Sequence, residues 1–474
     1  MSNKTQPARG MRDFLPADIR KRNYVIGIIK SVYESYGFEP LETPAVENLE
    51  TLTGKYGEEG GQLMYKILKR GEKLDVSSGE KGLADLALRY DLTVPLARVV
   101  ANNKNELPKF FKRYQIQPVW RADRPAKGRF REFYQCDVDA IGSNSMIVEA
   151  ELISAVSEIL ERLGFDDFII WINNRKLLTG ILEGSNFLED EITDVLVSLD
   201  KLDKIGKEGV LNELERKGIS KNQIEELIKF IEIIEFCHQE FDRVVNNSSI
   251  DQNHPNLEKS KNQIFNDVII KLLKDPAAKV NESGLEGLKE IEFIIKTIDS
   301  SGLTRLRVNP ALARGLSYYT GAIFEINVPD LAGSLGGGGR YDGLIGMFGK
   351  EQIPACGFSL GLERIIVVME ERGMFPAELR NNAADVLVTI WNEESIGESL
   401  KLANDLRAQD LRVLIYPEAD KLGKQFKYAS QINIPFVCVL GETELAENKV
   451  TLKNMLTGEQ ETVAREETAS KIKQ

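Results

Sequence analysis

Strand-forming segments lie on both sides of a long stretch, residues 175–302, that is rich in Lys and Glu and follows a helical period. Before this stretch, residues 114–121 and 130–142 alternate well enough to predict two antiparallel strands. After it, two further strands are predicted at 306–309 and 323–326, and a strand followed by a helix is predicted at 355–371. We therefore expect an α+β fold with a mostly antiparallel sheet and a helical insertion.

The end of the chain, residues 385–474, alternates strands and helices, which predicts a compact α/β domain. A chain of 474 residues is long enough for several domains. The expected order is the first part of the body at 1–174, the helical insertion at 175–302, the second part of the body at 303–375, a linker at 376–384 and the C-terminal domain at 385–474.

The chain has only two histidines, His238 and His254, and both lie in the helical stretch. A Ser-His-Asp triad, a histidine zinc site or a histidine general base would need a histidine among the strand-bearing segments. The sequence therefore argues against all three kinds of site.

Cysteine use and hydropathy indicate where the chain works. The cysteines form no CxxC pair and suit a reducing compartment: Cys136, Cys237, Cys356 and Cys438. No stretch approaches the roughly 18 apolar residues of a membrane span. Residues 1–10 have no apolar core of a signal peptide. We expect a cytoplasmic protein with no membrane partner.

The net charge of −12 argues against a general nucleic-acid binder, but one local run is basic. Residues 109–131 hold eight Lys and Arg residues and one acid, Asp123. A solvated basic face is the usual explanation of such a run. Here aromatic residues and Gly128 interrupt the charges, which favours a loop that handles phosphate.

Within this run, WRADRP (120–125) and GRFREF (128–133) resemble motif 2 of class II aminoacyl-tRNA synthetases. An arginine held on a strand forms a fixed fork for a phosphate and a carboxylate together. GFSLGLER (357–364) resembles motif 3 of the same class, with an arginine at the start of a helix. Residues 38–47, with Pro44, resemble motif 1, the dimer-forming element.

Three further segments resemble the histidyl-tRNA synthetase family: RYDLTVP (89–95), FYQCDVD (133–139) and LARGLSYYTG (312–321). They occur in the family's order, and the resemblance runs from about Arg9 to the end of the chain. Ser317 departs from the family pattern, which more often has Asp there. The resemblance implies a class II catalytic core with an anticodon-binding domain after it.

The resemblance also implies the reaction. L-histidine reacts with ATP to give histidyl-adenylate and pyrophosphate, and histidine then passes to the 3′ end of tRNA(His). Arg121 and Arg314 are the implied catalytic residues, and the implied ATP-binding residues are Arg121, Arg129, Arg314 and Arg364. Mg²⁺ is expected to bridge the ATP phosphates without a protein metal site. No protein base is needed, because the attacking carboxylate is already ionised at neutral pH.

A pocket for imidazole must offer a partner to each ring nitrogen. Asp139 and Tyr319 are the candidates, with Tyr318 and Tyr341 as lining residues. The substrate ammonium is expected to meet Asp91, Thr93 and Gln135, and Arg121 and Arg314 also contact the substrate. Each tyrosine also has an explanation without a ligand. Tyr318 and Tyr319 could be ordinary aromatic residues of a strand, and Tyr341 could be a turn residue.

Three other functions stay open at this point. The first is the histidine-sensing regulatory subunit of ATP phosphoribosyltransferase, which is expected to lack the C-terminal domain and the ATP-site arginines. The second is a class II synthetase for another amino acid, and the third is a tRNA-binding scaffold without catalysis. The motif 1-like stretch predicts a homodimer in the synthetase case.

Overall fold

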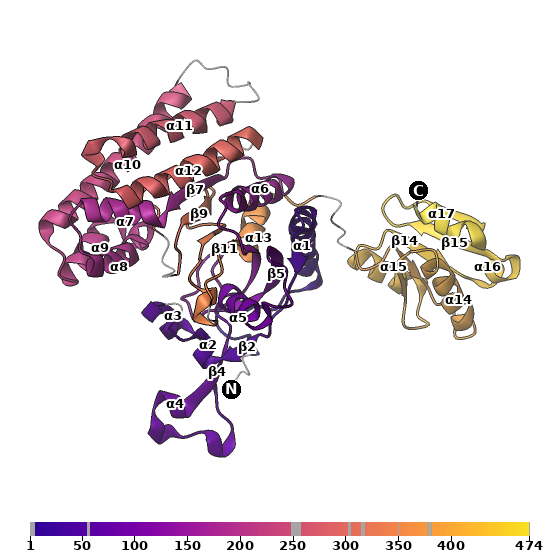
Figure 1. Cartoon of the computed structure of the whole chain (residues 1–474). Coiled ribbons are helices and arrows are strands. Elements are labelled where there is room, and N and C mark those ends of the chain that lie inside the picture. The colour runs from indigo at the N-terminus through magenta and orange to yellow at the C-terminus, as the bar shows by residue number, and fades with distance from the viewer. Residues whose placement is uncertain are drawn as a thin grey trace. The chain divides into compact units, whose positions relative to one another are not determined.

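Eight strands form the main sheet of the larger of two compact units, which holds Lys21–Met374 (Figure 1). The computed structural model describes residues 5–54, 57–247, 257–301, 305–313, 318–349, 351–376, 379 and 382–473. In order across the sheet the strands are β1 (Glu39–Pro40), β5 (Phe111–Trp120), β6 (Glu132–Ile141), β11 (Ala355–Gly361), β10 (Gly336–Arg340), β9 (Ala322–Asn327), β7 (Ile169–Asn174) and β8 (Leu306–Val308).

All neighbours between β5 and β7 pair antiparallel, and only the outer strands β1 and β8 pair parallel. This confirms the predicted antiparallel body. The glycine run at 336–339 is a central strand, with β9 on one side and β11 on the other. An added Cβ on Gly338 would lie 2.0 Å from the carbonyl oxygen of Gly357, so a side chain there would force these strands apart.

One face of the sheet is covered by α1 (Pro16–Ser35), α6 (Ile147–Arg162) and α13 (Leu362–Glu371). Val25, Ile29 and Val32 of α1 are buried. Arg22 of α1 and Glu363 of α13 form an ion pair of 2.8 Å in which both side chains are buried. The opposite face of β5, β6 and β11 is left for polar side chains.

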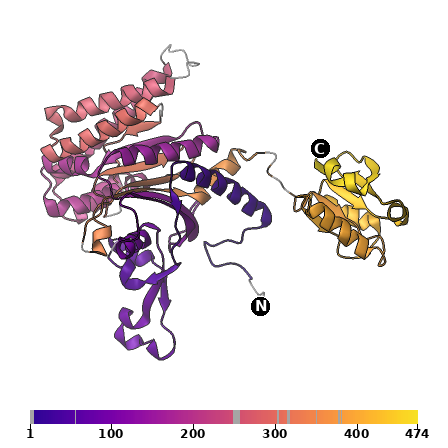
Figure 2. The same ribbon diagram turned by 45° about the vertical axis from the view of Figure 1, so that its right-hand side comes forward.

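A smaller sheet and an arm lie beside the main sheet. The sheet has the order β2 (Val46–Asn48), β4 (Ala84–Leu88), β3 (Lys66–Leu68), and residues 66–88 form the arm, which includes α4 (Glu80–Leu83). Around it lie α2 (Leu49–Leu52), α3 (Gly57–Leu63) and α5 (Thr93–Asn103). In both views the arm projects from one end of the body (Figure 2).

The helical stretch gathers at the other end of the body, and consists of α7 (Arg175–Gly184), α8 (Glu189–Leu199), α9 (Leu202–Arg216), α10 (Lys221–Asn247), α11 (Leu257–Lys274) and α12 (Glu282–Ser301). Asn266 of α11 forms hydrogen bonds with the backbone of the edge strand β8. Its Nδ2 donates to the carbonyl of Leu306 at 2.9 Å, and its Oδ1 accepts from the amide of Val308 at 2.9 Å. The insertion therefore also completes the main sheet, while its boundaries stay a prediction.

The second unit, Phe375–Gln474 in its main part, has a five-stranded sheet. The order is β13 (Val413–Ile415), β12 (Val386–Val388), β14 (Phe436–Val439), β15 (Lys449–Asn454) and β16 (Gln460–Ala464), with helices α14 (Ile396–Arg407), α15 (Leu422–Gln431), α16 (Glu442–Glu447) and α17 (Thr468–Lys473). The first three strands were expected from the sequence, whereas β15 and β16 were not. In the described residues, no helix is both long and apolar enough to cross a membrane.

Candidate active site

Three rows of directly opposed residues cross β5, β6 and β11: Arg113, Asp139 and Gly357; Gln115, Asp137 and Ser359; Gln117, Gln135 and Gly361. Side chains two residues apart on a strand point to the same face. The rows therefore place their polar groups together on the face opposite α1, α6 and α13.

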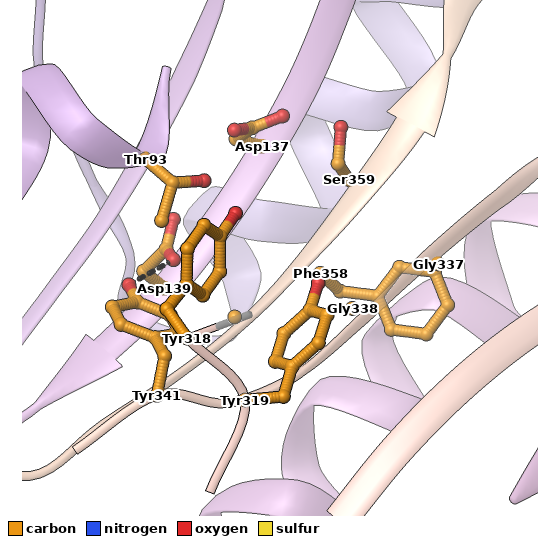
Figure 3. A pocket seen from close by; sticks show the side chains of 11 residues that line it. Thr93, Asp137, Asp139, Tyr318, Tyr319, Gly337, Gly338, Tyr341, Phe358 and Ser359 are labelled. Atoms are coloured by element: carbon orange, nitrogen blue, oxygen red, sulfur yellow. Dashed lines mark hydrogen bonds between the residues drawn. The ribbon is translucent and has the colours of Figure 1, made fainter. Parts of the chain in front are cut away.

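A cavity lies over the first two rows (Figure 3). The lining residues are Thr93, Asp137, Asp139, Tyr318, Tyr319, Gly337, Gly338, Tyr341, Gly357, Phe358 and Ser359. The structure thus brings together five of the predicted pocket residues: Thr93, Asp139, Tyr318, Tyr319 and Tyr341.

Asp139 is held in place from several sides. The Tyr341 hydroxyl donates to its Oδ1, and Nη2 of the fully buried Arg113 lies 2.8 Å from its Oδ2. Burial raises the pKa of Asp139, and Arg113 opposes that rise. A Cβ on Gly357 would lie 1.9 Å from Asp139 Oδ1, so the position opposite Asp139 on β11 requires a glycine. Arg113 was not predicted, because its role depends on the register of β5 against β6.

The tyrosines pack edge to face at the side of the cavity. The ring centroids of Tyr318 and Tyr319 are 5.1 Å apart, and those of Tyr318 and Tyr341 are 6.0 Å apart. Burial raises the pKa of Tyr318 well above its usual value, and a hydrogen bond with the Thr93 side chain opposes that rise. The Tyr318 hydroxyl is therefore neutral at physiological pH.

Asp91 and Gln135 lie beside the cavity and outside its lining. The buried Asp91 accepts from the amide of Val94 at 3.0 Å, at the start of α5. Gln135 Nε2 donates to Ser359 Oγ at 2.9 Å. Asp137, between Gln135 and Asp139 on β6, was not chosen from the sequence. The sequence signal that could have identified Asp137 is the strand period of two, which places it on the same face as Gln135 and Asp139.

Arg121 follows the end of β5 directly. Its Nε donates to the carbonyl of Tyr90 at 3.0 Å, and its guanidinium lies over the rings of Tyr90 and Phe133, 4.4 Å and 5.3 Å from their centroids. The aromatic rings and one carbonyl therefore fix the direction of this fork.

The predicted ATP side joins the loop after β5 to the start of α13. Arg129 Nη2 lies 2.7 Å from Asp123 Oδ1. Arg364 Nη1 donates to the carbonyl of Ser334. Gly128, at φ +66°, packs on Arg364, since a Cβ there would lie 3.3 Å from Arg364 Cγ. Arg129 and Arg364 thus come from neighbouring backbone, while Arg314 lies outside the described residues.

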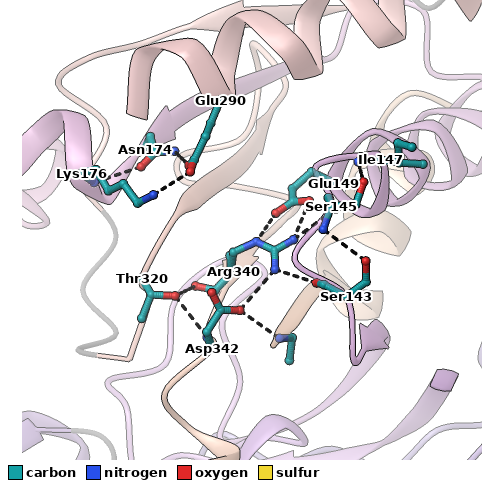
Figure 4. A network of polar contacts seen from close by, with 11 residues as sticks. Ser143, Ser145, Ile147, Glu149, Asn174, Lys176, Glu290, Thr320, Arg340 and Asp342 are labelled. Carbon is teal, nitrogen blue, oxygen red and sulfur yellow. Dashed lines mark hydrogen bonds and ion pairs between the residues drawn. The ribbon is translucent and has the colours of Figure 1, made fainter. Parts of the chain in front are cut away.

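A polar network around Arg340 adjoins the pocket residue Tyr341 in sequence (Figure 4). Arg340, the last residue of β10, bonds through Nη2 to Glu149 Oε2 at 2.8 Å and through Nη1 to the carbonyl of Ser143 at 2.9 Å. Burial raises the pKa of Glu149, and Arg340 opposes that rise. The Thr320 amide donates to the Arg340 carbonyl at 2.8 Å. Because Tyr341 follows Arg340 directly, this network fixes the backbone that presents Tyr341 to Asp139.

Family models match most of the chain. A histidyl-tRNA synthetase model matches residues 10–258 and 204–365, and an anticodon binding domain model matches residues 385–474. The histidine–tRNA ligase of Porphyromonas gingivalis is 44% identical over 466 residues, which cover 96% of this chain and 95% of that protein.

Solved structures agree with this assignment. The crystal structure of histidyl-tRNA synthetase from Nostoc sp. PCC 7120 is 33% identical, with a TM-score of 0.74 and 99% of each chain covered. A Bacillus halodurans protein, described as an ATP phosphoribosyltransferase regulatory subunit/histidyl-tRNA synthetase, has a TM-score of 0.66 at 19% identity, covering 92% of this chain and 99% of its own, and so shows the fold alone. The regulatory alternative is not favoured, and the chain belongs to the histidyl-tRNA synthetase family.

Proposed function

We propose that this chain joins L-histidine to tRNA(His) through histidyl-adenylate, with the cavity over β6, β10 and β11 as its histidine pocket. As a member of the histidyl-tRNA synthetase family, the chain is an ATP-dependent aminoacyl-tRNA ligase. The main support for the pocket is the Asp139 carboxylate, which lines the cavity, is buried, and is oriented by Arg113 and Tyr341.

Asp139 and Tyr319 are proposed to bind the two nitrogens of the imidazole. A neutral imidazole carries one donor and one acceptor nitrogen, so it needs one acceptor and one donor from the protein. The Asp139 carboxylate accepts, and the Tyr319 hydroxyl is able to donate. Tyr318 and Tyr341 complete the wall, and Asp91, Thr93 and Gln135 are proposed for the ammonium group.

Arg121 is proposed to bridge the histidine carboxylate and the α-phosphate of ATP. Arg129 and Arg364 are proposed for the outer phosphates, and Arg314 for the α-phosphate from the other side. Attack of the carboxylate forms a C–O–P bond and releases pyrophosphate, through a transition state rich in negative charge. Fixed positive groups lower its energy without moving during the reaction.

Mg²⁺ is proposed to arrive with ATP, where it would neutralise part of the phosphate charge. The described residues bring together no group of three or more His, Cys, Asp or Glu side chains fit for an ion. In this proposal phosphate and water oxygens are therefore its main ligands. The body and insertion boundaries, with a linker at 376–384 before the anticodon-binding domain, also stand as proposals.

A homodimer in the cytoplasm is proposed as the working form. The motif 1-like stretch contributes β1, a two-residue edge strand next to β5, and its Pro44 discourages sheet extension. A twofold dimer would bury this stretch against its own copy. Sedimentation at micromolar concentration tests it, and a monomer there contradicts it.

Exchange of labelled pyrophosphate into ATP, measured with each amino acid in turn, tests the proposed activity. We expect exchange with L-histidine alone. Exchange with a different amino acid would move the chain to another substrate, and no exchange with any of them would contradict the proposal.

A further inference from the structure

Asp137 lies in the middle of the polar row on β6, and its side chain lines the cavity (Figure 3). The side chain is almost fully buried, and the roles proposed above do not use it. Its Oδ1 has no hydrogen-bond partner among the residues that the structure describes. The Oε1 atom of Gln135, two residues earlier on the same face, also has no hydrogen-bond partner among the described residues. Two buried acceptors thus lie side by side without a donor.

The buried guanidinium of Arg113 forms its close ion pair with Asp139 and not with Asp137. Its Nη2 atom lies 2.8 Å from Asp139 Oδ2, and its Nη1 atom donates to Gln115 Oε1 at 3.3 Å. A buried carboxylate without a cation is costly. The pocket walls therefore hold more negative than positive charge, which favours a ligand that brings a cation.

Ser359 fixes the orientation of both acceptors. Its Oγ accepts from Gln135 Nε2 at 2.9 Å, which leaves its own proton for a hydrogen bond to the Asp137 carboxylate. With the amide nitrogen of Gln135 occupied, the amide oxygen is the end that stays available. The serine therefore prepares two acceptors for one donor group.

We propose that Asp137 is a further binding residue for the substrate's ammonium group, which it contacts together with Asp91 and Gln135 Oε1. An ammonium group has three N–H donors, and Asp137 Oδ1 and Gln135 Oε1 are acceptors for two of them. The inference rests on the proposed function and adds a specificity residue to its pocket. The ammonium would supply the positive charge that Arg113 does not.

The acid–base behaviour of Asp137 agrees with this role. Burial, Asp139 and Asp91 raise its pKa to about 7, although Arg113 and Ser359 lower it. The charged and titratable groups that interact with it electrostatically are Arg113, Arg89, Asp91, Asp139, Tyr33, Cys136 and Tyr318. In the empty pocket Asp137 is thus partly protonated at neutral pH, and an arriving ammonium would drive its proton off.

Calorimetric titration of the full-length protein with L-histidine and with imidazole-4-propionate, which lacks the ammonium group, tests the inference. Asp137→Asn keeps the shape and the hydrogen bond with Ser359 but removes the charge. We expect L-histidine to bind about 10-fold or more weakly to this variant, because a hydrogen bond to a charged group is lost. Binding of imidazole-4-propionate should stay within about two-fold.

Asp167→Asn is the matched control, since Asp167 pairs with Arg372 at 2.8 Å and is no part of the cavity lining. It should leave both affinities unchanged. Titration at pH 7 in buffers of different ionisation enthalpy should show less proton release with Asp137→Asn than with the unmodified protein. The titration of the ligand itself is common to both proteins.

Unchanged histidine affinity in Asp137→Asn would overturn the inference. Equal weakening of both ligands would also overturn it, because it would assign Asp137 to the scaffold or to the imidazole. Failure of the unmodified protein to bind L-histidine is a different result, which contradicts the proposed function itself.

Discussion

The two sides of the proposed site are built differently. On the histidine side, Arg113 is 0% exposed, Tyr341 is 1% exposed and Asp139 is 3% exposed, and both Arg113 and Tyr341 contact the Asp139 carboxylate. On the ATP side, the Arg129 side chain is 39% exposed and pairs with Asp123. Arg121 and Arg364 are bonded to backbone carbonyl oxygens.

This difference follows from what each side has to recognise. A buried pocket rejects a wrong side chain because its polar groups are then left unpaired, so they must be oriented before the ligand arrives. A phosphate site recognises charge that many molecules carry, and its task is to stabilise the transition state. We therefore expect changes on the histidine side to affect selectivity and changes on the ATP side to affect rate.

Arg121→Ala should give the largest effect. An arginine on a transferring phosphoryl group contributes roughly 10³ to 10⁵ in rate. Histidine-dependent pyrophosphate exchange should fall by at least about 10³-fold, while the preference for histidine over other amino acids stays. Steady-state exchange assays measure both quantities. Arg121→Lys should recover little, since an ammonium lacks the planar fork. A variant with normal exchange would remove Arg121 from the reaction.

Asp139→Asn should show the opposite pattern. The preference for L-histidine should shrink by up to roughly 10⁴-fold in kcat/KM, because a buried partner of the imidazole is changed. Exchange rates with each amino acid at saturating ATP measure this loss, and the KM for ATP should change little. Retained selectivity would mean that the imidazole binds elsewhere, and the comparison between the two sides would no longer hold.

Much of this contrast was accessible from the sequence, but not all of it. The alternation at 114–121 and 130–142 predicted β5 and β6, and the tyrosines at 318, 319 and 341 do meet at one cavity. Their roles stay predictions. Arg113 and Ser359 were missed, because which residues face each other across strands depends on register, and register is set by the folded sheet. Asp137 was missed although the strand period of two places it on the same face as Gln135 and Asp139.

The second unit shows a different limit. β16 has one buried residue, Val463, so its hydrophobic pattern is weak. It is a strand because β15 pairs with it from Lys449 to Lys453. Tertiary pairing of this kind overrides local preference. Residues 449–454 did carry an alternating pattern at Val450 and Leu452, and that signal was available.

Glu149→Gln tests the support behind the histidine side. Removing one charge of a buried pair leaves the other uncompensated and costs about 3 kcal/mol of unfolding free energy. Because Arg340 positions Tyr341, the KM for histidine should rise several-fold with a smaller change in kcat. Denaturant unfolding and exchange kinetics check these values. Lys176→Met is the control, since the Lys176–Glu290 pair in Figure 4 is partly exposed and should contribute less than about 1 kcal/mol.

The stability of the empty protein should depend on pH through Asp137. The pKa of Asp137 is about 7 in the folded chain, above its value near 3.9 when unfolded. Between these values the folded state binds one more proton than the unfolded state, so stability falls as pH rises. For one group the slope is about 1.4 kcal/mol per pH unit between the two pKa values, and it vanishes above pH 7, where the loss of stability is complete.

Asp137→Asn should remove this part of the slope, so the difference in unfolding free energy between variant and unmodified protein should grow in the variant's favour from pH 5 to pH 7. Denaturant unfolding at several pH values measures it. Saturating L-histidine should shrink the difference, because the ammonium stabilises the ionised carboxylate. Asp123→Asn on the ATP side is the control, since this variant keeps Asp137 and should therefore keep the Asp137 part of the slope. Equal slopes in the Asp137 variant and the unmodified protein would mean that the empty histidine side carries no uncompensated acid, and the contrast with the ATP side would then rest on geometry alone.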